Sequence, residues 1–173
     1  YIPTNVISIT DGQIFLESSL FFSGMRPAVN VGLSVSRVGG DAQTKAMKKA
    51  AGSLRIDLAQ YREMEVFTQF SSDLDDATKE QLEYGSGLME LLKQPLGKPM
   101  SLADKVITLC AARHKVMLGI PTAKVKGFQM DMLSYFASVH PEIAREIEET
   151  KDLSKELSQK IVEIAEEFKK SRC

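Results

Sequence analysis

The sequence lacks tryptophan, and aromatic residues make up only 7% of its 173 residues. Its core must therefore be built mostly from Leu, Ile, Val, Met and Ala. No stretch approaches the roughly 18 apolar residues that a bilayer-spanning helix needs, so we expect no membrane span. The formal net charge of -1 gives no overall attraction to nucleic acid. Hydrophobic content of 43% and charged content of 26% are those of an ordinary soluble globular protein.

Motifs for metal binding and for common catalytic chemistry are also absent. Cys110 and Cys173 form no CxxC pair, which fits a reducing compartment, and we expect Cys110 to be a small buried hydrophobe. His114 and His140 have no partner ligand at a metal-binding spacing, so no metal site is predicted. There is no GxSxG and no GxxxxGK[ST] motif, so the chain can supply only part of a nucleotide site. It begins with Tyr1 rather than Met and has no basic leader, and we expect a fragment of a longer chain.

The first 40 residues are rich in β-branched residues, glycine and proline. Short strands are predicted at residues 5–10, 14–16 and 29–35, with about one helical turn at residues 18–23. Three such strands cannot make a stable sheet alone. We interpret them as the cut end of a larger sheet.

The rest of the chain has apolar residues at helical spacing. The first such stripe contains Ala50, Leu54, Leu58, Tyr61, Met64 and Phe67. Ser101 is predicted to cap a later helix, and Pro141 suits the first turn of another. The predicted fold class is mainly α: an antiparallel bundle of about five to six helices preceded by a few short strands.

Two polar clusters could carry chemistry. Arg37 follows an apolar strand and precedes Gly39 and Gly40, a context that permits close approach to a phosphate, although spacing alone favours a surface or ion-pair role. The carboxylates of Asp73, Asp75 and Asp76 could attract a hard cation, but helix capping explains them more simply.

Long runs of the chain resemble the alpha subunit of rotary F-type ATP synthases. The matching segments are YIPTNVISITDGQIFLE at 1–17, GMRPAVNVG at 24–32, SVSRVGG at 34–40, AQTKAMKK at 42–49, LAQYRE at 58–63, SDLDDAT at 72–78 and ELLKQ at 90–94. Residues 95–173 have the length and the helical pattern expected of the family but contain few family-specific motifs. The resemblance implies that residues 1–44 end a P-loop α/β nucleotide-binding domain and that residues 45–173 form the C-terminal helical domain.

The resemblance also assigns site residues. Arg37 matches an arginine finger donated to the catalytic site on the adjacent beta subunit, and Ser8 matches a serine near the same phosphate. Positions facing the adenine of a non-exchanging Mg-ATP match Phe21, Arg26, Pro27 and Gln94. Leu96 and Gly97 depart from the family pattern beside that adenine. Asp73, Asp75 and Asp76 match a loop that faces the rotor.

The partners implied are beta subunits, the gamma rotor subunit and other alpha subunits in an alternating hexamer that couples H⁺ or Na⁺ flow to ATP synthesis and hydrolysis. The implied location is peripheral, on the cytoplasmic face of a bacterial plasma membrane, or on an organellar inner membrane in a eukaryote. We expect the fragment alone to be inactive and to bind no Mg-ATP or ADP. One alternative is a helical protein-interaction module with no catalytic role. A second is a self-contained nucleotidase, which the absence of a phosphate-binding loop argues against. A third is a beta or vacuolar-type subunit, which the sequence around Arg37 argues against.

Overall fold

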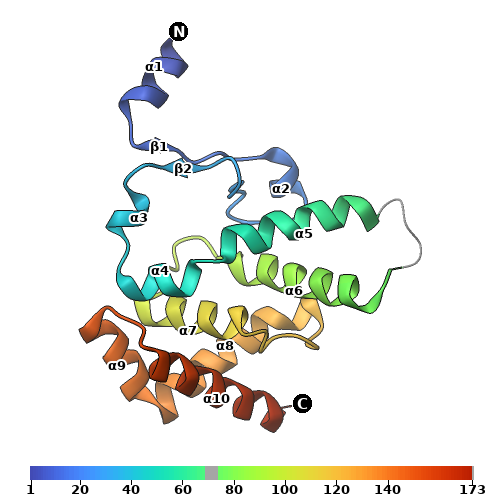
Figure 1. The fold of residues 1–173 in the computed structure, drawn as a ribbon, viewed down its shortest axis with the longest axis vertical. Coiled ribbons are helices and arrows are strands. Elements are labelled where there is room, and N and C mark those ends of the chain that lie inside the picture. The colour runs from blue at the N-terminus through green and yellow to red at the C-terminus, as the bar shows by residue number, and fades with distance from the viewer. Residues whose placement is uncertain (69–73, 173) are drawn as a thin grey trace.

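A computed structural model describes residues 1–68 and 74–172, and most of them are helical (Figure 1). The N-terminal segment contains α1 (Ile2–Ile9), β1 (Gly12–Gln13), α2 (Ser18–Phe22), β2 (Val35–Ser36) and α3 (Gly39–Ala42). The bundle contains α4 (Lys45–Ala51), α5 (Leu54–Thr68), α6 (Asp76–Leu92), α7 (Leu102–Arg113), α8 (Thr122–Val139), α9 (Pro141–Thr150) and α10 (Lys155–Arg172). The predicted mainly-α bundle is confirmed.

The strand predicted at residues 5–10 is wrong, because α1 occupies this segment. A strand needs a neighbouring strand to pair its main-chain groups, whereas a helix pairs them internally. Among the described residues the only ladder joins β1 to β2, and α1 projects away from the bundle beyond it (Figure 1). No residue of α1 is buried, so packing does not select its conformation.

Of the other two predicted strands, the one at residues 14–16 is wrong, since β1 lies just before it, and only Val35 of the one at 29–35 belongs to a strand. β1 and β2 form an antiparallel pair with Gly12 opposite Ser36, and a single bridge joins Leu16 to Val29. The run at 29–35 is interrupted because Asn30 begins a turn, with its carbonyl accepting from the Ser34 N–H at 3.0 Å. Gly12 has a φ of +154°, and a Cβ there would lie 2.0 Å from the Val35 carbonyl oxygen. Only glycine fits that position.

The first apolar stripe divides into two helices at Gly52, and the second of them pairs with α6. α5 and α6 run antiparallel side by side (Figure 1). Their close approach depends on Gly85, since a Cβ at this position would lie 2.3–2.5 Å from atoms of the Tyr61 side chain. Because α6 runs back along α5, its C-terminal end lies near the N-terminal segment.

α7 is the central helix of the bundle and packs against α4, α8, α9 and α10. Side chains are buried on most of its surface. These buried residues are Ala103, Val106, Ile107, Thr108, Cys110, Ala111 and Ala112. Aliphatic, alanine and methionine side chains from the surrounding helices complete the core, together with Phe136 and Phe168.

Local signals at the helix termini behave as the sequence predicts. The Ser101 hydroxyl accepts a hydrogen bond from the Asp104 N–H at 3.0 Å and caps α7. Pro141 occupies the first turn of α9, and Cys110 is buried as expected. Within residues 1–68 and 74–172, no helix combines the length and the apolar character needed to cross a membrane.

Candidate functional site

Arg37 lies between β2 and α3 with its side chain exposed. Its guanidinium donates hydrogen bonds to the main-chain carbonyl oxygens of Ser8 at 3.2 Å and of Ile7 at 3.3 Å. These carbonyls belong to the last turn of α1, where the helix dipole is negative. The structure thus brings together Arg37 and Ser8, the two residues expected at a catalytic phosphate. The Ser8 hydroxyl itself donates to the Asn5 carbonyl at 2.8 Å.

The turn that carries Arg37 is held by Asp11. The Asp11 carboxylate accepts from the Ser36 hydroxyl and from the Val38 N–H, the latter at 2.8 Å. Its carbonyl oxygen accepts from the Arg37 N–H at 2.9 Å. The bond from Ser36, followed by the bond from Val38, lowers the pKa of Asp11. An ionised carboxylate therefore organises both sides of Arg37.

Three of the four residues expected near an adenine also meet. The Arg26 guanidinium lies over the Phe21 ring, 4.5 Å from its centroid, in a cation–π arrangement. The Gln94 N–H donates to the Arg26 carbonyl at 2.9 Å, which links α2 and its following loop to the end of α6. Phe21 remains 47% exposed, so its ring has surface left for stacking. The side chains of Arg26 and Gln94 are exposed as well.

The remaining positions of this group follow in the same two loops. Pro27 is joined to Arg26 by a cis peptide bond. Leu96, one of the departures from the family pattern, is completely exposed, and Gly97 has a φ of +70°. The Gln94 amide contacts the Met100 sulfur at 3.8 Å. The loop after α6 therefore presents both Gln94 and Leu96 at the surface.

The two described residues of the carboxylate cluster, Asp75 and Asp76, have separate partners. Asp75 caps α6 by accepting from the Thr78 N–H at 3.0 Å, and hydrogen bonding to Thr78 lowers its pKa. Asp76 is fully exposed and pairs with Lys79 at 3.1 Å. Asp73 lies outside the described residues. No group of three or more His, Cys, Asp or Glu side chains is placed to hold a metal ion in the part of the chain that the structure describes.

Asn30, which the sequence did not single out, joins the N-terminal segment to the bundle. It is 6% exposed, and its side-chain Nδ2 donates to Glu17 at 2.7 Å. Its Oδ1 accepts from the Leu33 N–H at 3.0 Å and from the Arg62 guanidinium at 3.1 Å. A second arginine of α5, Arg55, donates to the Gly32 carbonyl at 2.9 Å. The turn is therefore fixed to α5 at two points.

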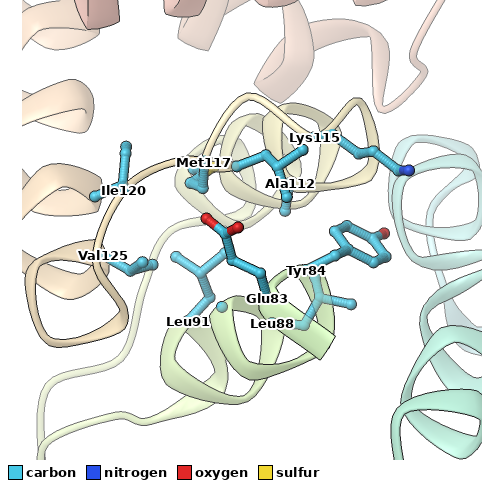
Figure 2. A pocket seen from close by; sticks show the side chains of 11 residues that line it. Glu83, Tyr84, Leu88, Leu91, Ala112, Lys115, Met117, Ile120 and Val125 are labelled. Atoms are coloured by element: carbon cyan, nitrogen blue, oxygen red, sulfur yellow. The ribbon is translucent and has the colours of Figure 1, made fainter. Parts of the chain in front are cut away.

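A small cavity between α6 and the connection from α7 to α8 offers little room for a ligand. Figure 2 shows Glu83, Tyr84, Leu88 and Leu91 of α6 facing residues from the end of α7, the turn that follows it and the start of α8. The cavity has a volume of about 10 Å³, about the space of one water molecule. The Glu83 carboxylate accepts from the Gly119 N–H at 2.6 Å, so it has a structural partner there.

Comparison with known proteins matches almost the whole chain. The family of the ATP synthase alpha/beta chain, C terminal domain, matches residues 43–168, and the ATP synthase alpha/beta family, nucleotide-binding domain, matches residues 1–36. The chain is 56% identical to ATP synthase subunit alpha of Clostridium kluyveri, 54% to that of Petrotoga mobilis and 57% to that of Acetivibrio thermocellus. These alignments cover 97–98% of the chain and 33–34% of each relative. The chain therefore spans about a third of the length of the curated relatives it matches.

Proposed function

The chain belongs to the ATP synthase alpha/beta family, as part of an alpha subunit, and from this premise we propose that it donates Arg37 as an arginine finger to a catalytic site on an adjacent beta subunit. The observation that carries the proposal is the exposed Arg37 guanidinium beside Ser8, on a turn held by Asp11. The guanidinium donates hydrogen bonds to main-chain carbonyl oxygens, and its charge also acts on the nearby Asp11 carboxylate. Its neutral carbonyl acceptors are weaker partners than a phosphate.

The chemistry follows from the charge and shape of the guanidinium. Its planar set of donors can bind two oxygens of one phosphoryl group. In phosphoryl transfer, negative charge spreads over the transferring oxygens, and an arginine supplied from a neighbouring subunit stabilises that charge. Arg37 would exchange its bonds to Ser8 and Ile7 for bonds to these oxygens. Ser8 would remain close to the same group.

We also propose that Phe21, Arg26, Pro27 and Gln94 hold the adenine of a nucleotide bound by the complete subunit. The half-exposed Phe21 ring and the exposed Gln94 amide suit an aromatic base with polar edges. The chain has no GxxxxGK[ST] loop, so the triphosphate and Mg²⁺ would be held by other parts of the subunit. Residues 1–44 would complete that nucleotide-binding domain, and residues 45–173 would form a distinct helical domain.

The working assembly is an alternating hexamer of alpha and beta subunits around a gamma rotor, peripheral to the cytoplasmic face of a bacterial plasma membrane. Ion flow through the membrane part would turn the rotor and drive synthesis. Asp75 and Asp76, at the exposed start of α6, would face the rotor. Their exposure leaves these two carboxylates accessible to a basic partner.

The test is Arg37→Ala in the assembled complex. We expect assembly to be retained and ATP hydrolysis to fall by roughly 10³-fold or more, because an arginine finger typically contributes 10³–10⁵ in rate. Arg37→Lys should recover little activity, since an ammonium cannot reproduce the fork of donors. Arg145→Ala, which removes an exposed arginine of α9, is the control and should leave hydrolysis unchanged. Hydrolysis within tenfold of the parent in Arg37→Ala would reject the role and favour a purely structural module.

A further inference from the structure

Two arginines of α5 hold the turn that leads to Arg37. This turn begins at Asn30 and lies directly before β2, and Arg37 follows β2. The half-buried Arg62 donates from its guanidinium to Asn30 Oδ1 at 3.1 Å. One helical turn after another separates it from Arg55, whose guanidinium donates to the Gly32 carbonyl oxygen at 2.9 Å. A helix of the bundle therefore contacts the segment that carries the proposed arginine finger.

The Asn30 side chain is the junction between the helix and the turn. Its Oδ1 accepts from Arg62 and also from the Leu33 N–H at 3.0 Å, so one oxygen both meets the bundle and closes the turn. Its Nδ2 donates to Glu17 at 2.7 Å. A neutral amide placed between a guanidinium and a carboxylate is polarised by both, and each hydrogen bond strengthens the other. Arg62 thereby helps to fix the orientation of the amide.

Hydrogen bonds continue from Asn30 to the strand that precedes Arg37. The Asn30 carbonyl oxygen accepts from the Ser34 N–H at 3.0 Å and from the Ser34 hydroxyl at 2.6 Å. The same hydroxyl oxygen accepts from the Phe15 N–H at 2.9 Å. β2 follows at once and pairs with β1. Because each of these steps is bonded, a displacement of the turn would displace β2 and Arg37 with it.

We propose that Arg62 is a positioning residue for Arg37, acting through Asn30 and the turn. The inference rests on the arginine-finger role proposed above and deepens it. Arg62 would touch no substrate; it would tie the place of the Arg37 guanidinium to α5. A misplacement of about 1 Å can cost about 100-fold in rate, so a contact remote from the phosphate can matter to catalysis.

Arg62→Met in the assembled complex tests the proposal, because it removes the donor and keeps an unbranched apolar stem. We expect kcat for ATP hydrolysis to fall by about 10- to 100-fold with KM unchanged, since Arg37 acts on charge that develops in the transition state. Arg62→Lys should recover part of this loss, because an ammonium can still donate to a single oxygen. Arg145→Met, the same substitution at an exposed arginine of α9, is the matched control and should leave kcat unchanged. An unchanged kcat in Arg62→Met would overturn the proposal.

Combining Arg62→Met with Arg37→Ala separates positioning from a general loss of active complex. If Arg62 acts through Arg37, Arg62→Met should lower the rate by less than about twofold once Arg37 is absent, because the two effects are coupled. A defect in folding or assembly would instead lower the rate by the same factor in both backgrounds. That result would overturn the proposal.

NMR of the 173-residue chain measures the placement of Arg37 without reference to hydrolysis. The carbonyl carbons of Ile7 and Ser8 accept its hydrogen bonds through their oxygens, so their chemical shifts report where the guanidinium lies. Arg62→Met should move both shifts at least halfway toward their values in Arg37→Ala, and Arg145→Met should not move them. Shifts that stay at their parent values would overturn the positioning role.

The two measurements distinguish this inference from the proposed function. If Arg62→Met moves both shifts while Arg37→Ala leaves hydrolysis within tenfold of the parent, the placement of Arg37 by Arg62 stands and the arginine-finger role alone fails. Arg62→Gln, whose shorter side chain withdraws the donor from Asn30, should give the same shifts and the same loss of kcat. It keeps both measurements decisive should Arg62→Met fail to fold.

Discussion

Arg37 reaches back 29 residues along the chain, and its guanidinium donates to the carbonyl oxygen of Ser8 at 3.2 Å. The two residues come from the end of α1 and from the turn after β2, and the short ladder between β1 and β2 aligns them. Main-chain carbonyls are neutral acceptors, so this contact can be exchanged for a charged one at little cost. The arrangement keeps a cation oriented at the surface.

The turn around Arg37 should depend on the ionisation of Asp11. The pKa of Asp11 is below its ordinary value of 3.8, chiefly because the Ser36 hydroxyl donates to the carboxylate. Its contribution to stability is therefore complete above pH 3.8 and is lost as the pH falls through the lower, folded-state pKa. Ser36→Ala should raise the pKa of Asp11 toward 3.8, measured by NMR titration of the carboxyl carbon. An unaltered Asp11 midpoint would contradict the assignment.

Asn30→Ala should loosen the N-terminal segment from α5. The substitution removes the bonds to Glu17, Leu33 and Arg62 at a site that is 6% exposed. We expect the local opening free energy to fall by about 2 kcal/mol. Native-state hydrogen exchange at the Leu33 and Ser34 amides measures this change.

The chain offers a matched control, because Asn5 is exposed in α1. Asn5→Ala should leave the exchange of both amides as it is in the parent chain. Equal exchange in Asn30→Ala and in the parent would show that the turn is held by other contacts, such as the bond from Arg55 to Gly32.

Gly85→Ala should destabilise the contact between α5 and α6. The added methyl would lie 2.3–2.5 Å from the Tyr61 side chain, so the two helices must separate or the ring must move. Overpacking of this kind costs about 1–3 kcal/mol, more than the roughly 1 kcal/mol that alanine adds in helix propensity. Urea denaturation gives the free energy of unfolding.

The control is Gly127→Ala, at an exposed glycine of α8 where an added Cβ meets nothing within 4 Å. Helix propensity alone acts there, so this variant should be more stable than the parent by up to about 1 kcal/mol. A Gly85→Ala variant that gains stability to the same extent would refute the steric argument.

Local sequence signals predicted helix ends correctly where all the required contacts lie within one short segment of the chain. The Ser101 cap and the placement of Pro141 depend on residues within a single turn of chain, and both are confirmed. The strand predicted at residues 5–10 failed because strand formation depends on a neighbour, and among the described residues that segment has none. Asn30 was missed because its partners Glu17 and Arg62 come from distant parts of the sequence.

The sequence by itself determined the helical content, the helix caps and the family. These depend on the short-range spacing of residues and on the order of sequence motifs along the chain. Tertiary structure decided which atoms meet: the Arg37 guanidinium bonds to the Ser8 carbonyl, Arg26 lies over the Phe21 ring, and Gln129 is buried with an oxygen that has no partner among the described residues. Each of these relations joins separate elements or depends on what surrounds a side chain. Periodicity states which residues turn inward, but the packing of several helices at once determines what they meet.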